Sequence, residues 1–296
     1  MSKENNTLPA MIASRAEIIT DPAQRTVRVI AETEAQEICR QSAKSLREVY
    51  IAALGEGIWP VRYMRNASAL SAADQRKLAQ SRVAVIGAGG LGGHVIMTLA
   101  RMGIGRLTVT DPDRFEESNL NRQVLAAADT LGTNKAEAAK KIISGVNPAV
   151  EVQSQPLRLD AANAGHVLEG ANAVVDALDN VPDRLVLAYA CKNQGIPLVH
   201  AAIAGFEGQI MTIYPEDPGL EQIYGDAGSA FEPSAAPEAV LGVPAVTPAV
   251  LAALQAMETV KILVDRGRGI RRRMLYADLE NRGFQEFSFG SDPDQT

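Results

Sequence analysis

The sequence has 296 residues, of which 46% are hydrophobic and 22% are charged, and its formal net charge is −6 with an isoelectric point near 5.3. These values are typical of a globular chain with one large domain and an appendage, and the acidic balance argues against a nucleic-acid partner. No apolar run approaches the roughly 18 residues of a membrane-spanning helix, and the amino terminus lacks the apolar core of a signal peptide, so we expect a cytoplasmic protein that has no membrane partner.

The first 60 residues predict a small α+β extension of unassigned function, which is followed by one main domain over residues 61–296. Residues 25–31 have the pattern of a strand, and the apolar residues within 32–54 recur at helical spacing, which predicts one amphipathic helix. The glycines and the proline of GEGIWP then interrupt the helical pattern.

Strand and helix patterns alternate from residue 82 to residue 203, after a short helix that Ser71 is expected to cap. Thr133 is expected to open the second helix of this series. The strand patterns lie at 82–87, 106–111, 150–155, 172–179 and 197–203, and the helix patterns lie at 92–102, 134–145, 160–170 and 181–195. Such an alternation predicts an α/β fold of the Rossmann-like, doubly wound type, with a mostly parallel sheet that is covered on both faces.

The carboxyl-terminal part departs from this alternation and predicts antiparallel strands. The loop that it contains is rich in glycine, proline, alanine and acidic residues, which is typical of a connecting segment. In chain order this part has a strand at 208–215, the long loop at 216–246, a helix at 247–265, and a closing β pair at 273–279 and 283–289.

A glycine-rich turn follows the strand at 82–87. Gly87, Gly89 and Gly92 form a G-x-G-x-x-G pattern between a strand and a helix, with Gly90 inside it. Glycines at these positions allow a tight turn and a close approach of the backbone to phosphate at a helix amino terminus. The next strand ends at Asp111, where an acidic side chain can bind ribose hydroxyls. This pattern favours a nucleotide but does not distinguish NAD from ATP.

Two cations favour a triphosphate. The stretch DPDRFEESNLNRQ follows the second strand and places Asn119, Arg122 and Gln123 near the phosphate end of the expected site, together with Asp113. Lys135 stands in the first turn of the next helix, where a cation opposes the helix dipole and costs a few tenths of a kcal/mol or more. A lysine that reaches a phosphate explains this placement better than a lysine that only faces solvent.

The stretch VVDALDN completes the expected site. Asp176 and Asp179 lie at the carboxyl end of a predicted parallel strand, where open α/β sheets bind ligands, and Asn180 comes next. A carboxylate beside a triphosphate is a natural ligand of Mg²⁺. We predict that Asp179 binds Mg²⁺ and that Asp176 supports the site from behind. Several cations and a magnesium carboxylate exceed what the pyrophosphate of NAD needs.

In this order and spacing, the motifs resemble those of the ThiF/MoeB/HesA family of ubiquitin-activating-enzyme-like adenylyltransferases. Between about residues 60 and 280, the resemblance is carried by GAGGLGG, DPDRFEESNLNRQ, GTNKAEAAKK, VNPAVEV, DALDNVPDR and IPLVHAAIAGFEGQI. The stretch RYMRN resembles the family's RYxRQ element and maps Arg62 and Arg65 onto it, with Asn66 in place of the usual glutamine. The resemblance implies that an arginine of this element enters the ATP site of a partner subunit, and therefore that the protein is a homodimer.

The resemblance also implies a reaction, in which ATP adenylates the C-terminal glycine of a small ubiquitin-like sulfur-carrier protein and pyrophosphate leaves. Because a carboxylate is already ionised at pH 7, no general base is needed, and catalysis reduces to alignment and charge neutralisation. We expect Arg65, Arg122, Lys135 and Mg²⁺ on Asp179 to provide it. The expected ATP-binding residues are Gly87, Gly89, Gly90, Gly92, Asp111, Asp113, Asn119, Arg122, Gln123, Lys135, Asp179 and Asn180.

The cysteines depart from the pattern of many members of this family. Cys39 and Cys191 are the only two in the sequence, and neither belongs to a C-x-x-C pair, so we predict no zinc site. The loop after the GQI strand has no cysteine, so the usual site of a thioester or persulfide exchange is missing. We expect Cys191 to pack in the core from a helix.

Two alternatives stay open. The same chemistry could act on the carboxylate of a peptide or of a modified tRNA, although the acidic composition disfavours tRNA. The chain could also be an NAD-binding oxidoreductase or a non-catalytic Rossmann protein. Arg122, Lys135 and Asp179 argue against this second alternative, because a silent relative would be free to lose them.

Overall fold

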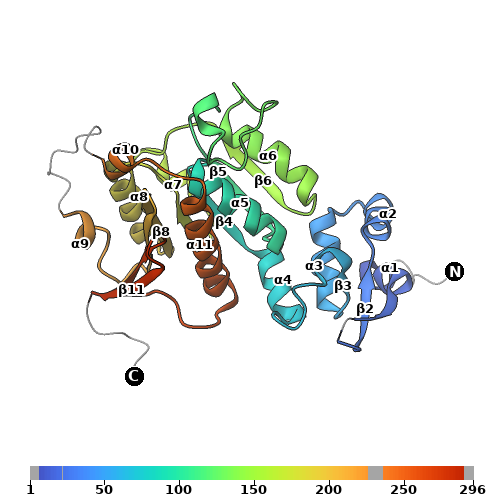
Figure 1. Cartoon of the computed structure of the whole chain (residues 1–296). Coiled ribbons are helices and arrows are strands. Elements are labelled where there is room, and N and C mark those ends of the chain that lie inside the picture. The colour runs from blue at the N-terminus through green and yellow to red at the C-terminus, as the bar shows by residue number, and fades with distance from the viewer. Residues whose placement is uncertain (1–6, 22, 226–235, 290–296) are drawn as a thin grey trace.

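An eight-stranded sheet forms the centre of the larger domain in the computed structural model, which describes residues 7–21, 23–225 and 236–289 (Figure 1). Five strands run parallel and the last three in the chain run antiparallel to their neighbours. In spatial order they are β11 (Gly283–Ser288), β10 (Arg273–Asp278), β9 (Glu207–Ile213), β8 (Leu198–Ala204), β7 (Ala173–Asp176), β4 (Arg82–Ile86), β5 (Arg106–Thr110) and β6 (Glu151–Gln155).

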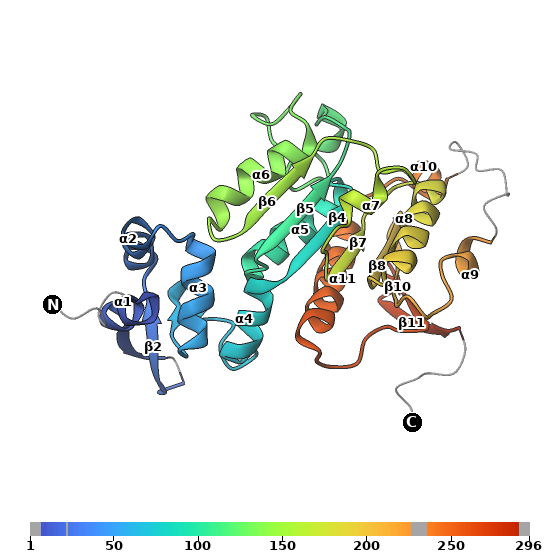
Figure 2. The ribbon, with the colours of Figure 1, turned by 180° about the vertical axis from the view of Figure 1, so that it is seen from behind.

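Helices cover both faces of this sheet, as the front and back views show (Figures 1 and 2). On one face, α5 (Gly90–Met102), α6 (Lys135–Val146) and α11 (Val246–Val264) share a hydrophobic core with β4 and β5. On the other face, α7 (Ala164–Val167) and α8 (Val181–Gln194) pack over β4, β7 and β8. The predicted doubly wound α/β fold with antiparallel carboxyl-terminal strands is confirmed.

The order of the parallel strands determines where a crevice forms. The chain leaves β4 towards β5 and β6 on one side, and it then returns to β7 and β8 on the other side. The loops that follow β4 and β7 therefore diverge at the carboxyl edge of the sheet. Such a switch point is where open α/β sheets bind ligands.

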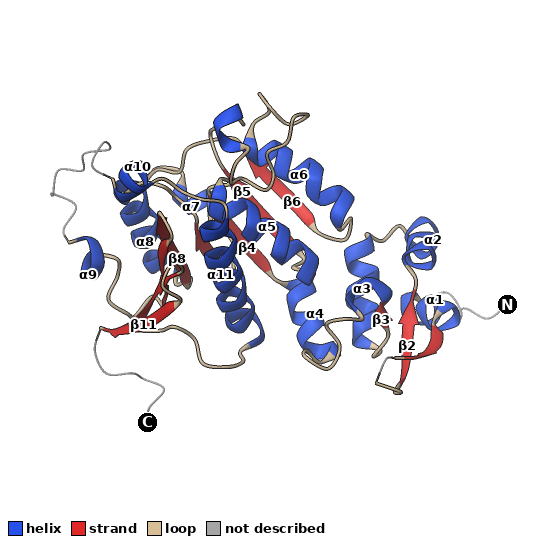
Figure 3. Cartoon of the chain, in the orientation of Figure 1, coloured by secondary structure: helices blue, strands red, loops and turns tan. Residues whose placement is uncertain are grey.

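The described residues among the first 60 form a small α+β extension at one end of the molecule (Figure 3). Its core contains Ile38, Tyr50 and Trp59, and its last helix packs against α4 (Ala72–Gln80) of the larger domain. Its elements are α1 (Leu8–Arg15), β1 (Glu17–Thr20), β2 (Thr26–Ile30), α2 (Glu32–Ser42), α3 (Leu46–Gly55) and β3 (Trp59–Pro60).

The single helix expected over 32–54 is in fact two helices. The first ends at Ala43, which has a left-handed backbone with φ of 54°. The second begins at Ser45, whose side chain accepts a hydrogen bond from the backbone N–H of Glu48 while the Glu48 carboxylate accepts one from the backbone N–H of Ser45. This reciprocal cap ends one helix and starts the next, and it overrides the shared apolar periodicity.

The expected elements also differ from the structure in two connections. The helix expected over 160–170 is only the short α7, because the carboxylate of Asp160 accepts hydrogen bonds from the backbone of Ala162 and Asn163 and forms a turn instead. The loop expected over 216–246 contains α9 (Glu221–Tyr224) and α10 (Pro237–Leu241) in its described part.

Helix α11 is long and apolar enough to cross a membrane by its composition alone, which the sequence analysis did not anticipate. It instead lies along the sheet and packs against α5 and β8. Half of its most apolar 18-residue stretch is buried inside this domain. Gln255, Glu258 and Thr259 are buried in it and hydrogen-bonded to other described residues. This is the pattern of a core helix.

Candidate active site

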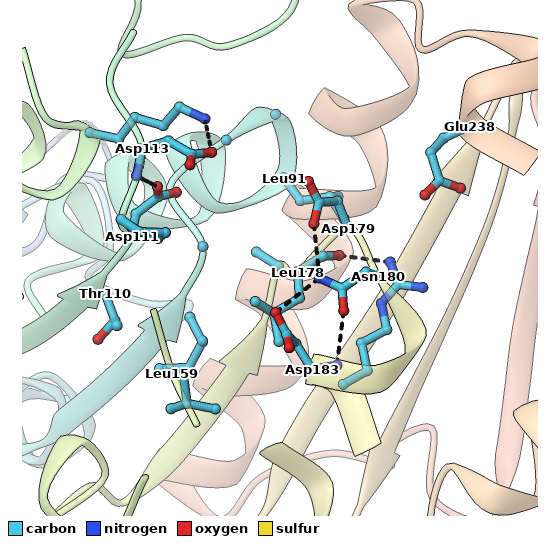
Figure 4. Close-up of a pocket in the computed structure, with 18 of the residues that line it drawn as sticks. Leu91, Thr110, Asp111, Asp113, Leu159, Leu178, Asp179, Asn180, Asp183 and Glu238 are labelled. Atoms are coloured by element: carbon cyan, nitrogen blue, oxygen red, sulfur yellow. Dashed lines mark hydrogen bonds and ion pairs between the residues drawn. The ribbon is translucent and has the colours of Figure 1, made fainter. Parts of the chain in front are cut away.

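A pocket of about 730 Å³ opens at the carboxyl edge of the sheet, above the switch between β4 and β7 (Figure 4). The loops that follow β4, β5, β6 and β7 form its floor and sides, and residues of α10 form a further wall. Segments that are far apart in the sequence meet here because every parallel strand ends at the same edge.

The glycine turn after β4 has no room for a side chain at two positions. A Cβ on Gly87, whose φ is +96°, would lie 2.4 Å from the carbonyl oxygen of Ala177, and a Cβ on Gly92 would lie 1.9 Å from the carbonyl oxygen of Gly87. Gly89 and Gly90 line the pocket, whereas Gly92 lies inside the turn. The amino terminus of α5 has no side-chain cap, so its backbone N–H groups are available to an anion.

Asp111 ties this turn to the loop after β5. One carboxylate oxygen accepts a hydrogen bond of 2.7 Å from the backbone N–H of Ala88, and the other accepts one of 2.8 Å from that of Asp113. Burial raises the pKa of Asp111, although these hydrogen bonds and the nearby Lys135 ammonium favour its charged form. Its side chain also lines the pocket, so it both shapes the turn and faces the pocket.

Lys135 is the first residue of α6, and its side chain is only 9% exposed. Its Nζ lies 3.0 Å from a carboxylate oxygen of Asp113, and both residues line the pocket (Figure 4). Asp113 is 61% exposed. A largely buried ammonium group is therefore held at a helix amino terminus by a carboxylate that water also reaches.

Asn134 positions this lysine, and the sequence analysis missed it. The helix was expected to open at Thr133, but Asn134 is its N-cap and accepts hydrogen bonds from the backbone of Ala136 and Glu137. Its side-chain nitrogen donates to the carbonyl oxygens of Asp111 and Asp113, at 3.0 Å each. An asparagine three residues before a glutamate is a usual helix-start pattern that could have identified it.

Arg122 and Gln123 add polar groups to the same wall. The guanidinium of Arg122 donates to the Ser118 carbonyl and the Asn121 side chain, and it has no carboxylate partner among the described residues. The side-chain oxygen of Gln123 and the hydroxyl of Thr110 are buried without a hydrogen-bond partner, yet both residues line the pocket. Orphaned polar atoms at a pocket wall indicate a polar ligand.

Asn119 does not line the pocket, contrary to the role expected for it. It ends the turn η3 (Glu117–Asn119), where its side-chain oxygen accepts a hydrogen bond of 3.2 Å from the backbone N–H of Glu116. Its amide is thus used within its own loop, which it shapes ahead of Arg122.

Asp179 and Asn180 lie on the opposite wall, on the loop after β7 (Figure 4). Asp179 is exposed and accepts a hydrogen bond of 3.3 Å from the side chain of Asn180, which also caps α8 by accepting one from the backbone N–H of Asp183. No cluster of three or more metal-ligating side chains exists among the described residues. One carboxylate beside phosphates suits Mg²⁺, which keeps several waters and substrate oxygens as ligands.

Asp176 supports this loop from below, as expected. It is fully buried and accepts hydrogen bonds from His200, at 2.7 Å, and from the backbone N–H of Leu178, at 2.9 Å. Arg184 is also buried near it and lines the pocket. The sequence analysis assigned no role to Arg184 or to His200.

Arg62 and Arg65 lie far from the pocket of their own chain. They belong to or follow the turn η2 (Val61–Tyr63), and Tyr63 packs on Gly103, at the end of α5 opposite to the glycine turn. Arg62 pairs with Glu32 of the extension. Arg65 is exposed and forms no hydrogen bond or ion pair with other described residues. In one chain, β4 thus lies between Arg65 and the pocket.

The two cysteines also lie away from the pocket lining. Cys191 is buried in α8, as expected, and burial raises the pKa of its thiol. Cys39 is partly buried in α2 of the extension, where burial also raises its pKa. Both thiols are therefore poor nucleophiles at neutral pH.

Several known proteins are similar to this chain in sequence or in fold. The model of the ThiF family matches residues 63–296. The SAMP-activating enzyme E1 of Haloferax volcanii is 42% identical over 221 residues, which are 74% of this chain and 81% of that one. A sulfur carrier protein adenylyltransferase of Thermus thermophilus is 36% identical over 228 residues, with 74% and 82% covered. The ATP-bound crystal structure of MccB from E. coli has the same fold, with a TM-score of 0.67, 24% identity and coverage of 79% and 73%.

Proposed function

This chain belongs to the ThiF family, and on that premise we propose that it adenylates the C-terminal glycine of a small ubiquitin-like sulfur-carrier protein, with release of pyrophosphate. It is an adenylyltransferase that uses ATP. The observation that carries the proposal is one pocket at the switch point that contains a phosphate-type glycine turn, Arg122, Lys135 and Asp179.

The pocket residues suit the parts of ATP. The backbone N–H groups at the start of α5 and the Lys135 ammonium suit phosphate oxygens, since both bring positive charge to a helix amino terminus. Asp111 suits the ribose hydroxyls. The unpaired polar atoms of Thr110 and Gln123 remain for hydrogen bonds to the nucleotide.

The reaction requires charge neutralisation rather than proton transfer. The carrier's carboxylate attacks the α-phosphorus of ATP, the bond to the bridging oxygen of pyrophosphate breaks, and that oxygen takes the electron pair. Negative charge grows on phosphoryl oxygens during this step, and Arg122 and Lys135 are held in place before it occurs. Mg²⁺ bound at Asp179 would supply further positive charge.

We propose that Arg65 completes the site from the partner subunit of a homodimer. Its exposure and its distance from the pocket of its own chain support this arrangement. Leu120, Val124 and Val250 are apolar residues that are 42%, 44% and 37% exposed, which suits contact with a partner. Val124 and Pro248 of α11 both border the first turn of α5, so Val124 lies near the amino-terminal end of α11.

The carrier leaves this protein as an acyl adenylate in our proposal, and sulfur comes from another protein. Neither cysteine lines the pocket, and both thiols have raised pKa values. A Cys39→Ser, Cys191→Ser variant is therefore expected to keep near-normal pyrophosphate exchange, and metal analysis is expected to find no zinc. We also propose a cytoplasmic location. The amino-acid composition and the packing of α11 against the sheet support it.

The test is ATP–pyrophosphate exchange with a candidate carrier that ends in Gly-Gly, captured from the source organism by pull-down. Exchange is expected only with the intact carrier, and the matched control is the same carrier without its last glycine. Calorimetry with MgATP and with NAD provides an independent check. Tighter binding of NAD than of MgATP, or exchange that ignores the terminal glycine, would overturn the proposal.

A further inference from the structure

A network of hydrogen-bonded polar side chains, three of which are buried, lies beneath the pocket and joins four elements. It consists of Asp176 on β7, His200 on β8, Tyr224 on α9 and Arg184 on α8. The carboxylate of Asp176 lies 2.7 Å from Nδ1 of His200, and Nε2 of His200 lies 3.1 Å from the Tyr224 hydroxyl. Asp176 and His200 are both 0% exposed, so the hydrogen bond between them is shielded from water, whereas Tyr224 is partly exposed.

The donors determine the direction of every hydrogen bond in this network. Arg184 and Gln209 each direct an N–H group at the oxygen of the Tyr224 hydroxyl, at 3.1 Å. The hydroxyl hydrogen is therefore left to donate to Nε2 of His200, which must be the unprotonated ring nitrogen. His200 then carries its proton on Nδ1 and donates it to Asp176. Nε of Arg184 is buried without a hydrogen-bond partner and lies 3.9 Å from the Asp176 carboxylate.

The far end of this network holds the residue before Asp179. A carboxylate oxygen of Asp176 accepts a hydrogen bond of 2.9 Å from the backbone N–H of Leu178, and Arg184 donates one of 2.7 Å to the carbonyl oxygen of Leu178. Both backbone polar groups of Leu178 are thus held by buried charged side chains. The direction in which the chain continues to Asp179 follows from these two contacts.

We propose that His200 and Tyr224 are positioning residues that hold Asp179 in place for Mg²⁺. This inference rests on the proposed function, because it takes Asp179 as the ligand of the Mg²⁺ that accompanies ATP. Neither His200 nor Tyr224 lines the pocket, so they act through Asp176 and Arg184. Tyr224 belongs to the segment after β9. The same hydrogen bonds therefore connect that segment to the loop after β7, which contains Asp179.

The variant Tyr224→Phe tests this inference with little change in packing. It keeps the aromatic ring, which lies 5.7 Å from the His200 ring and 5.8 Å from the Arg184 guanidinium carbon. It removes the hydroxyl and leaves polar groups of His200, Arg184 and Gln209 without that partner. We expect the Mg²⁺ concentration that half-saturates the gain in ATP affinity to rise on the order of fivefold, the scale of one net hydrogen bond.

The measurement is binding of a fluorescent ATP analogue by anisotropy, first in EDTA and then across a MgCl₂ titration, so no carrier is needed. Affinity in EDTA is expected to stay within about twofold of wild type, because the phosphate-binding turn and Lys135 are untouched. Asp179→Asn serves as the reference, and it should abolish most of the Mg²⁺-dependent gain. A purely structural defect would lower affinity under both conditions.

Two matched controls separate positioning from general destabilisation. Tyr50→Phe removes the hydroxyl of another buried tyrosine, which lies in α3 of the extension and beside Arg62. This variant should leave the Mg²⁺ titration unchanged. His200→Gln keeps a donor towards Asp176 and an acceptor towards Tyr224, so it should stay closer to wild type than His200→Leu. If Tyr224→Phe does not fold, as judged by thermal unfolding, the pair of His200 variants decides.

The outcomes distinguish this inference from the proposed function. If wild type binds no ATP analogue, or if Mg²⁺ dependence survives Asp179→Asn, the magnesium role of Asp179 is wrong and the inference fails with it. If both behave as expected and folded Tyr224→Phe titrates like wild type, only the positioning role is overturned. Equal titrations of His200→Gln and His200→Leu would overturn it in the same way.

Discussion

We expect substitution of Lys135 to lower the catalytic rate strongly while it changes the free energy of unfolding only a little. Its ammonium pairs at 3.0 Å with Asp113, which is 61% exposed, so water can solvate this carboxylate after the pair is lost. We therefore expect Lys135→Met, which keeps most of the apolar stem, to cost no more than about 1 kcal/mol of unfolding free energy. In the reaction the same ammonium faces growing charge on the phosphoryl group. Loss of one such donor should lower kcat roughly 10²- to 10³-fold, or about 2.7–4 kcal/mol.

The assay is carrier-dependent pyrophosphate exchange, combined with urea unfolding of the same preparations. Lys135→Ala should show a similar loss of kcat together with a larger loss of stability, because it also removes the buried stem. The matched control is Lys140→Met, which changes the same charge at an exposed position of the same helix. If Lys135→Met exchanges pyrophosphate at the wild-type rate, or if Lys140→Met loses as much activity, the role of Lys135 is wrong.

Two further predictions concern the partner subunit and pH. Mixed Arg65→Ala and Lys135→Met subunits should recover part of the exchange activity, because each mixed dimer contains one intact composite site; no recovery after verified subunit exchange would contradict the dimer proposal. Burial lowers the pKa of His200 below its ordinary value of 6.5, although the hydrogen bond that His200 donates to Asp176 raises it, and the nearby Arg184 guanidinium lowers this pKa further. The unfolded state therefore binds more protons, so stability from neutral His200 should be present above about pH 6.5 and decline as pH falls below it. Urea midpoints at pH 7.5 and 5.5 should differ more for wild type than for His200→Gln, and equal differences would refute this assignment.

The candidate site was largely predictable because its principal residues lie in short local motifs. The glycine turn is required by steric contacts within one βα unit and its neighbouring strand, and Gly87 with φ of +96° is such a position. Lys135 begins the helix α6, and Asp179 follows the strand β7. The apolar periodicity of both elements is visible in the sequence. Because parallel strands end at one edge, these ends could be expected to meet there.

Other site features depend on contacts between distant residues and had no local signal. The amide of Asn119 is used in its own turn, which its spacing in the motif did not reveal. Tyr224 and His200 are separated by 24 residues, and Tyr224 and Arg184 by 40, yet the Tyr224 hydroxyl is hydrogen-bonded to both side chains. Burial and the pairing of donors with acceptors, rather than sequence spacing, select such partners.

The sequence by itself determined the order of strands and helices, the glycine turn and the cations of the pocket, because apolar periodicity and backbone sterics act over a few residues. It did not reveal the split at Ala43, where a cap outweighs continuous helical periodicity. Only the tertiary structure decided that Arg65 lies across β4 from its own pocket, and that hydrogen bonds join side chains from four elements, two of which hold Leu178. These features depend on the direction and order of strands in the sheet, which bring together atoms that no local pattern relates.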